Sequence, residues 1–291
     1  MSDRFGRGGM KLGGILTAMV TPFDADGGFD EENAARLMHH LLENGSDGLV
    51  LAGSTGEGAT LTDEEKFRLW ELGVAEAGGA PVIAGTGTYD TRHSCELTER
   101  ATEIGVDAVL VVTPYYNKPN RRGCVEHFKA VAAATDRPVI VYNIPSRCVV
   151  DLPNDLLAEL AQIENVAAVK QARYEDVAPV DGMELLAGND DMLAKVLDLG
   201  GPGGILVSSH LVGREMRRMI DEPAARAEIH EQLSDLFKAL FVTTNPIPLK
   251  AALRLAGHDA GGLRLPLVEA SDEETATVRE ALERHGLLAR V

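Results

Sequence analysis

Short apolar runs alternate with longer amphipathic segments along most of the chain, and the alternation repeats eight times. The runs lack a polar face, which is typical of strands buried on both sides in a parallel sheet. The predicted strands span residues 14–20, 47–52, 81–85, 108–112, 138–142, 166–170, 184–187 and 204–207. The segments between and after them predict helices at residues 31–43, 63–77, 91–104, 123–134, 154–162, 190–199 and 213–220.

Eight strands in this alternation predict an α/β fold, the (β/α)8 TIM barrel. A doubly wound sheet usually has a G-x-G-x-x-G turn after its first strand, and this chain has none. Beyond the eighth unit only helical patterns remain, at residues 224–242, 248–256 and 272–285. We therefore expect an N-terminal tail at residues 1–12, a barrel at residues 13–221 and a C-terminal helical extension at residues 222–291.

The charge of the chain narrows its range of partners. Asp and Glu number 45 against 28 Lys and Arg, so the formal net charge is −17. Such a surface repels nucleic acid and anionic membranes, and no apolar run has the roughly 18 residues of a membrane helix. The three cysteines form no C-x-x-C pair. We therefore expect a cytoplasmic protein with reduced thiols, a small-molecule substrate, no nucleic-acid or membrane partner and no metal ion.

A lysine closes the sixth predicted strand. Lys170 follows the apolar run at residues 166–169, so the stem of its side chain begins inside the barrel. Barrel enzymes place catalytic groups at the C-terminal ends of their strands. Burial there disfavours the ammonium form and produces a nucleophile that forms a Schiff base with a ketone. The alternative is a strand-end lysine that extends to solvent.

Hydroxyl groups and an arginine follow other predicted strands. Ser54 and Thr55 lie beside glycines after the second strand, where they suit carboxylate binding and proton relay, or cap a helix. Tyr116 follows the fourth strand, and Tyr142 ends the fifth. Their phenols can transfer protons, or they are buried tyrosines whose hydroxyl groups have structural hydrogen-bond partners. Arg147 presents a planar fork to a carboxylate, or forms a surface ion pair.

In order and spacing these clusters resemble those of the dihydrodipicolinate synthase/N-acetylneuraminate lyase family, from about residue 13 to residue 287. The resemblance implies that Lys170 forms a Schiff base with pyruvate and that Tyr142 shuttles protons. Ser54 and Tyr116 would complete the relay, with Tyr116 reaching into the active site of a neighbouring subunit. The resemblance also implies a barrel with a helical C-terminal extension, a homotetramer built as a dimer of dimers, and no metal or diffusible cofactor.

Further positions correspond to substrate-binding residues of the family. Thr55 corresponds to the residue that holds the pyruvate carboxylate, and Gly188 and Ile205 correspond to pocket positions whose backbone groups line the site. Arg147 resembles the arginine that, in the synthase branch, holds the carboxylate of L-aspartate 4-semialdehyde. The implied reaction is the condensation of pyruvate with this aldehyde, in lysine and diaminopimelate biosynthesis.

The segment after the lysine departs from the synthase branch, in which Glu, Ala, Ser or Thr, and Gly are usual. Gln171 is typical of the lyases, whereas Arg173 and Tyr174 fit neither branch, and Ser54 stands where most synthases have threonine. A neuraminate-lyase-like enzyme or sugar-acid aldolase stays open as an alternative, because the polar residues at 189–191 and 208–209 can bind hydroxyl groups. A catalytically silent sensor of keto acids is an alternative of another class, and the complete proton-relay set argues against it.

Overall fold

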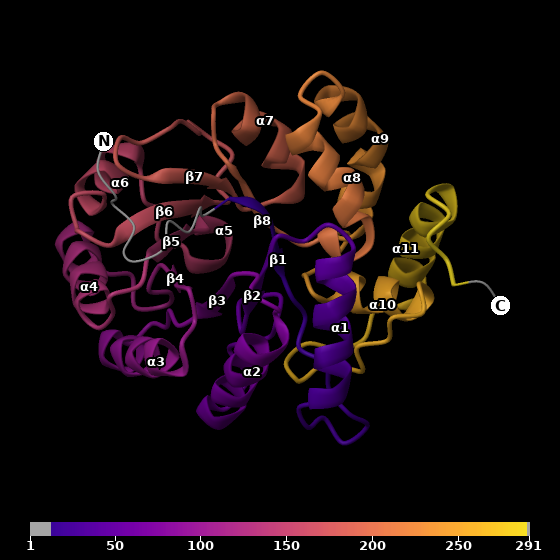
Figure 1. Cartoon of the computed structure of the whole chain (residues 1–291), viewed down its shortest axis with the longest axis horizontal. Coiled ribbons are helices and arrows are strands. Elements are labelled where there is room, and N and C mark those ends of the chain that lie inside the picture. The colour runs from indigo at the N-terminus through magenta and orange to yellow at the C-terminus, as the bar shows by residue number, and fades with distance from the viewer. Residues whose placement is uncertain (1–12, 290–291) are drawn as a thin grey trace.

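The computed structural model describes residues 13–289, and the predicted N-terminal tail at residues 1–12 lies outside them. Eight parallel strands close into a barrel in sequential order (Figure 1). The strands are β1 (Gly14–Ala18), β2 (Gly48–Leu51), β3 (Val82–Gly85), β4 (Ala108–Val112), β5 (Val139–Asn143), β6 (Val166–Gln171), β7 (Glu184–Ala187) and β8 (Gly203–Leu206). The predicted α/β class and TIM barrel are therefore confirmed.

Side chains from alternate strand positions fill the barrel interior. Because side chains alternate between the two faces of a strand, residues two apart on one strand point the same way. On β5, Ile140 and Tyr142 belong to the interior cluster, and on β6 the same cluster contains Ala168. Lys170 therefore has the inward parity of β6, and the register pairs it directly with Tyr142.

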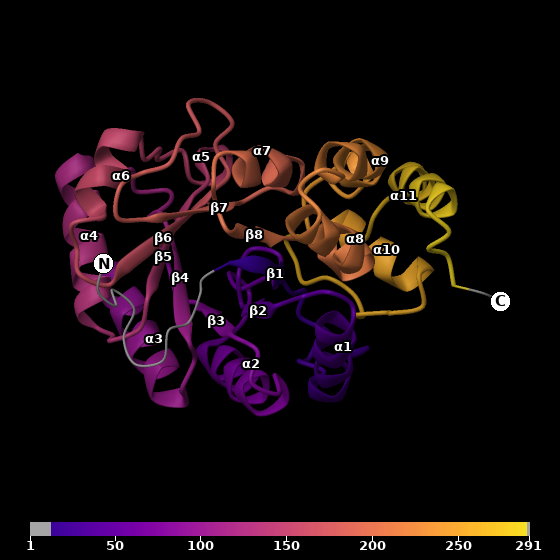
Figure 2. The same cartoon turned by 45° about the horizontal axis from the view of Figure 1, so that its top comes forward.

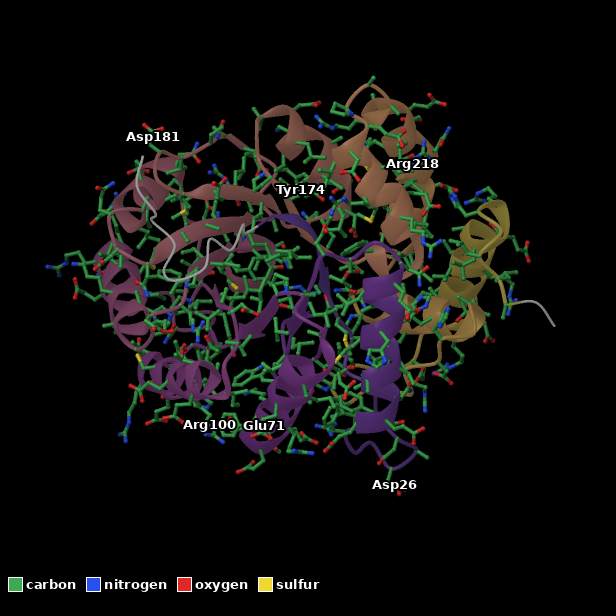
Figure 3. The ribbon with its side chains drawn as sticks, in the orientation of Figure 1. Asp26, Glu71, Arg100, Tyr174, Asp181 and Arg218 are labelled. Atoms are coloured by element: carbon green, nitrogen blue, oxygen red, sulfur yellow. The ribbon has the colours of Figure 1, made fainter. Side chains whose placement is uncertain are left out.

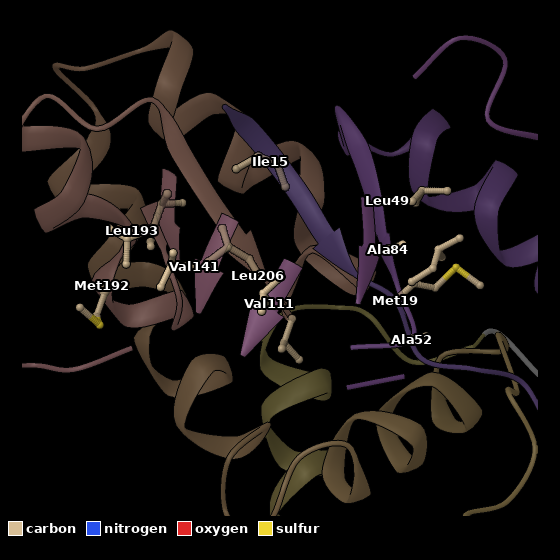
Figure 4. Close-up of a cluster of buried hydrophobic side chains, with 14 of the residues drawn as sticks. Ile15, Met19, Leu49, Ala52, Ala84, Val111, Val141, Met192, Leu193 and Leu206 are labelled. Carbon is tan, nitrogen blue, oxygen red and sulfur yellow. The ribbon is translucent and has the colours of Figure 1, made fainter. Parts of the chain in front are cut away.

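A ring of helices surrounds the strands (Figures 1 and 2). The helices of this ring and its loops are α1 (Glu31–Glu43), α2 (Asp63–Glu76), α3 (Thr91–Ile104), α4 (Arg121–Ala133), α5 (Pro145–Cys148), α6 (Asn154–Leu160), the 3-10 helix η1 (Asp190–Met192), α7 (Leu193–Asp198) and α8 (Ser209–Asp221). The outward strand residues, among them Ile15, Leu49 and Val111, form the larger buried cluster against these helices (Figure 4). Strands buried on both faces explain the apolar runs in the sequence.

Capping residues set the bounds of several helices. Thr62 begins α2, since its hydroxyl accepts a hydrogen bond from the Glu65 N–H while the Glu65 carboxylate accepts one from the Thr62 N–H. Gly105 ends α3 in the left-handed conformation, with φ of 100°. The predicted helices at residues 31–43 and 91–104 agree with α1 and α3 residue for residue.

Most other predicted bounds differ from the observed ones by one to three residues, as at α4 and α9, and three differences are larger. The single helical turn α5 was not predicted, because one turn is too short to show a helical period. The helix predicted at residues 190–199 is divided into η1 and α7. The helix predicted at residues 213–220 begins already at Ser209, with a break at Val212. The helical segment after this break starts at Gly213, as predicted, and a Cβ there would lie 2.3 Å from the Asn44 carbonyl oxygen.

Three further helices follow the barrel: α9 (Arg226–Ala239), α10 (Ile247–Leu255) and α11 (Asp272–Arg284). They pack on one another, and α9 also packs on α8, so that they extend the molecule on one side of the barrel (Figure 2). Among residues 13–289, no helix is long and apolar enough to cross a membrane.

Candidate active site

Lys170 lies near the C-terminal end of β6, enclosed by the barrel. It is 5% exposed, so its side chain does not extend to solvent. Its ammonium nitrogen lies 4.2 Å from the centre of the Tyr142 ring, on the paired residue of β5. The structure therefore brings the predicted nucleophile into contact with the predicted proton-transfer group.

The surroundings of Lys170 favour its neutral form. Burial lowers the pKa of its ammonium group from 10.5 to about 7, because the cation loses its hydration. The Asp190 carboxylate opposes this shift, and the Arg147 guanidinium adds to it. Burial also raises the pKa of Tyr142, so its phenol stays protonated and can act as a proton donor. An unprotonated amine beside a protonated phenol is what attack on a carbonyl group requires.

The loop after β2 carries the two predicted hydroxyl groups. Ser54 is exposed and lines, together with Tyr142, a cavity of about 310 Å³. Thr55 is 3% exposed, and its hydroxyl accepts a hydrogen bond of 2.8 Å from the side-chain amide of Asn245. Neither hydroxyl caps the helix that follows, because Thr62 caps α2.

A buried ion pair holds this loop against the C-terminal helices. Glu57 lies 2.9 Å from the ammonium group of Lys250 on α10, and both side chains are at most 1% exposed. Lys250 also donates to the carbonyl oxygen of Gly262, and Glu57 accepts from the backbone N–H of Arg264. Sequence analysis did not predict this pair, because its two residues lie far apart in the chain and follow no shared pattern.

Arg147 lies in α5, directly after β5. Its guanidinium donates a hydrogen bond of 2.9 Å to the carbonyl oxygen of Asn245, the residue whose amide binds Thr55. Arg147 is exposed and lines an open cavity of about 620 Å³ together with Arg173 and Tyr174. Asn245 thus connects the two groups that sequence analysis predicts to bind carboxylates. This role of Asn245 was not predicted.

Two further predicted positions belong to the strands β7 and β8. Gly188 directly follows β7, and its N–H donates a hydrogen bond of 2.8 Å to the carbonyl oxygen of Gln171. A Cβ at Gly188 would lie 2.7 Å from that oxygen, so only glycine fits. Ile205 on β8 is fully buried and belongs to the cluster inside the barrel.

Asp190 is a buried carboxylate that sequence analysis did not assign to the reaction. It is 1% exposed, and one oxygen accepts hydrogen bonds from the backbone N–H groups of Val207 and Ser208, at 2.9 and 3.1 Å. Burial raises the pKa of Asp190 to about 6. Its effect on the pKa of Lys170 makes it part of the electrostatic environment of the site. The sequence signal was the polar run at residues 189–191.

Tyr116 stands apart from the other predicted residues. It is 90% exposed, and its backbone is left-handed, with φ of 71°. Its neighbour Tyr115 lines the cavity of Ser54 and Tyr142, whereas Tyr116 does not. Non-glycine residues in this backbone region are uncommon and often occur in functional loops. A single chain therefore does not bring all four predicted catalytic groups together.

This fold and this site define an enzyme of the Schiff-base-forming class: a (β/α)8 barrel with a buried, weakly basic lysine at the end of a strand. Comparison with protein families matches residues 11–285 to the Dihydrodipicolinate synthetase family. The chain belongs to this family.

Its relatives match it over nearly their full length. The chain is 45% identical over 291 residues to the 4-hydroxy-tetrahydrodipicolinate synthase of Heliobacterium modesticaldum, covering 96% of this chain and 97% of that protein. The solved dihydrodipicolinate synthase of Aquifex aeolicus is 39% identical, with a TM-score of 0.91 over 96% of this chain and 100% of that chain. A solved monomeric dihydrodipicolinate synthase variant is 37% identical, with a TM-score of 0.87 over 95% and 97% of the two chains.

Proposed function

We propose that this chain condenses pyruvate with L-aspartate 4-semialdehyde, the 4-hydroxy-tetrahydrodipicolinate synthase reaction, in lysine and diaminopimelate biosynthesis. The observation that carries the proposal is the enclosed amine of Lys170, whose pKa is about 7, next to the ring of Tyr142. The second substrate is supported by Arg147, whose guanidinium lines an open cavity and acts on the pKa of Lys170, and by the name of the full-length relative.

The first half of the reaction activates pyruvate. The neutral amine of Lys170 attacks the keto carbon, and Tyr142 protonates the departing hydroxyl, so that water leaves and the imine forms. Ser54 and Tyr116 relay protons between Tyr142 and solvent. Thr55, held by Asn245, binds the pyruvate carboxylate. Because the protonated imine withdraws electrons, the Tyr142 phenolate left by the dehydration then takes a proton from the methyl group, which becomes the enamine carbon nucleophile.

The second half forms the new carbon–carbon bond. The enamine carbon attacks the aldehyde carbon of L-aspartate 4-semialdehyde, whose carboxylate is held by Arg147, and the aldehyde oxygen takes a proton from Tyr142 to become a hydroxyl group. The amino group of the adduct then attacks the imine carbon and displaces Lys170, which closes the ring and restores the free amine. Backbone groups of Gly188 and Ile205 line the pocket. The scheme requires neither a metal ion nor a diffusible cofactor.

Tyr116 completes the relay from a neighbouring subunit in this proposal, and the assembly is a homotetramer built as a dimer of dimers. The exposure of Tyr116 supports the assignment, because in a single chain its phenol is open to water and does not line the cavity of Ser54 and Tyr142. A second chain that covers this loop removes the water and supplies the missing group.

Reduction with borohydride in the presence of pyruvate tests the first half of the scheme. Borohydride converts the imine to a stable secondary amine, so Lys170 should carry the pyruvate-derived label and activity should be lost. Peptide mass mapping identifies the labelled residue. Label on another lysine, or no label at saturating pyruvate, would contradict the assignment.

Replacing Arg147 tests the second half. Arg147→Ala should lower turnover with L-aspartate 4-semialdehyde about tenfold or more, since a charge-assisted hydrogen bond contributes about 1.5–3 kcal/mol. Labelling of Lys170 by pyruvate should continue. Arg36→Ala is the control, because Arg36 is exposed on α1 and its ion-pair partner within residues 13–289 is the exposed Glu32. An unchanged rate in Arg147→Ala would favour the lyase or sugar-acid aldolase alternative.

A further inference from the structure

The loop after β2 is bound by the C-terminal extension at two neighbouring points. Asn245 lies in the connection between α9 and α10, and these C-terminal helices pack on one side of the barrel (Figure 3). Its side-chain amide donates a hydrogen bond of 2.8 Å to the Thr55 hydroxyl. Two residues further along the loop, Glu57 pairs with Lys250 on α10. The extension therefore supports the segment that carries Ser54 and Thr55.

The bond from Asn245 determines where the Thr55 hydroxyl can donate. An amide nitrogen only donates, so the hydroxyl oxygen accepts and keeps its own proton for another acceptor. Thr55 is 3% exposed, and within residues 13–289 its hydroxyl makes no other hydrogen bond. An ionised carboxylate is acceptor-only. The free proton of Thr55 is therefore suited to a carboxylate that enters the site.

The other end of the Asn245 amide is unusual. Its oxygen is buried and has no hydrogen-bond partner in the part of the chain that the structure describes. Such a group typically costs about 1–3 kcal/mol, and an amide that only stabilised the fold would have both of its polar atoms paired. Turned over, the amide would accept the proton of Thr55, and a substrate carboxylate would no longer receive it. The observed orientation leaves that proton available.

The backbone of the same residue positions a second group. The guanidinium of Arg147 donates a hydrogen bond of 2.9 Å to the carbonyl oxygen of Asn245. The side chain of Asn245 thus serves the group proposed to bind pyruvate, and its carbonyl serves the group proposed to bind the aldehyde. Because the carbonyl remains after any change of the side chain, an experiment can separate the two roles.

We propose that Asn245 is a positioning residue of the reaction, because its amide orients the Thr55 hydroxyl to donate to the carboxylate of pyruvate. The inference rests on the proposed function, which assigns that carboxylate to Thr55, and it adds to the site a residue of the C-terminal extension. Asn245 acts through Thr55 and does not touch the reacting carbon. It should therefore affect the binding of pyruvate, and imine formation at saturating pyruvate should continue at nearly the same rate.

The pyruvate dependence of borohydride labelling measures this effect without the second substrate. In Asn245→Ala, the pyruvate concentration for half-maximal labelling rate should rise about tenfold, since the hydroxyl loses its orientation toward a charged acceptor. Thr55→Val removes the hydroxyl and should cause a rise of similar size. The double variant should rise little further, because Asn245 acts through that hydroxyl. Independent effects would instead multiply to about a hundredfold.

Asn165→Ala is the matched control. Asn165 precedes β6 at the opposite end of the barrel, and its amide donates hydrogen bonds of 2.9 Å to the carbonyl oxygens of Ala132 and Thr135. This variant should lose stability and keep the half-maximal pyruvate concentration of the unchanged protein.

The second substrate gives a further readout. In Asn245→Ala, the KM for L-aspartate 4-semialdehyde at saturating pyruvate should change by less than about threefold, because the carbonyl that binds Arg147 remains. General damage to the site would raise both values together. A half-maximal pyruvate concentration within about twofold of the unchanged protein, or multiplied effects in the double variant, would overturn the proposal.

Asn245→Asp keeps the shape of the side chain and replaces Asn245→Ala if the alanine variant does not fold. Its carboxylate can only accept the proton of Thr55, so the half-maximal pyruvate concentration should rise about tenfold or more, and an unchanged value would again overturn the proposal. If the unchanged protein is not labelled by pyruvate, or is labelled and does not turn over L-aspartate 4-semialdehyde, the proposed function fails instead. The two failures are therefore distinguishable.

Discussion

Lys170 sets the pH at which the first step can occur. Its pKa of about 7, lowered from 10.5 by burial, means that the reactive neutral amine dominates above pH 7 and becomes scarce below it. At limiting pyruvate, the rate of borohydride-trapped adduct formation should level off above about pH 7 and fall about tenfold per pH unit well below that. Mass spectrometry of timed samples across this pH range measures the rate.

Replacing Asp190 tests whether a neighbouring charge sets the pKa of Lys170. Its charge raises the pKa of Lys170, so Asp190→Asn should shift the falling part of the profile to lower pH. Asparagine keeps an oxygen for the two backbone N–H groups that Asp190 binds. Asp181→Asn, an exposed carboxylate, should leave the profile unchanged. The same midpoint in Asp190→Asn and in the unchanged protein would show that Asp190 has no influence on Lys170.

Among the single residues of the site, the sequence predicts those whose positions depend on the alternation of strands and helices. Lys170 and Tyr142 end neighbouring strands, so their approach follows from parallel register once a barrel is assumed. Asn245 could not be predicted in the same way, because its contacts with Thr55 and Arg147 depend on how the C-terminal helices pack on the barrel. Local patterns do not encode contacts between residues so distant in the chain.

The buried ion pair of Lys250 and Glu57 joins helix α10 to the loop after β2, which carries Ser54 and Thr55. Breaking the buried pair Lys250–Glu57 leaves one charge without its partner, so Lys250→Met should lower the free energy of unfolding by about 3–5 kcal/mol. The double change Lys250→Met with Glu57→Gln should cost less than the sum of the single changes, because no buried charge remains. Urea unfolding of the four proteins completes the double-mutant cycle.

An exposed ion pair is the control for this cycle. Arg36 and Glu32 lie one turn apart on α1 with side chains 61% and 86% exposed, so removing either should have little effect on stability. Additive effects of Lys250→Met and Glu57→Gln would show that the buried pair is not energetically coupled. Loss of turnover in Lys250→Met, with the barrel still folded, is also expected, since the loop that carries Thr55 is anchored through Glu57.

The predicted helix bounds agree with the structure where local capping residues set them, and they differ where a helix is very short or where tertiary packing interrupts it. The helices α1 and α3 have both caps and periodicity, and their predicted bounds are confirmed. The turn α5, which positions Arg147, contains only Pro145–Cys148 and has no period to detect. The break in α8 at Val212 follows from close packing of Gly213 on the loop after α1, a tertiary cause invisible to a local pattern.

The assembly of the whole molecule depends on Tyr116, which does not line the cavity of Ser54 and Tyr142 in its own chain. Its 90% exposure contrasts with the burial of Lys170 and Tyr142. In a two-fold symmetric dimer the same surface contacts itself, so each chain would give its Tyr116 to the partner and receive one in return. An enzyme assembled in this way has sites made of residues from two chains, whereas a monomer would have to act without this group.

Mixing two inactive variants tests this arrangement. Lys170→Ala lacks the nucleophile, and Tyr116→Phe lacks the relay hydroxyl, so each alone should be nearly inactive. After the two are unfolded together and refolded, a mixed dimer contains one site with Lys170 from one chain and Tyr116 from the other. Random pairing should then restore about a quarter of the wild-type activity, because half of the dimers are mixed and each has one complete site. If Tyr116 acts within its own chain, no mixed dimer contains a complete site, and activity should stay at the level of the separate variants.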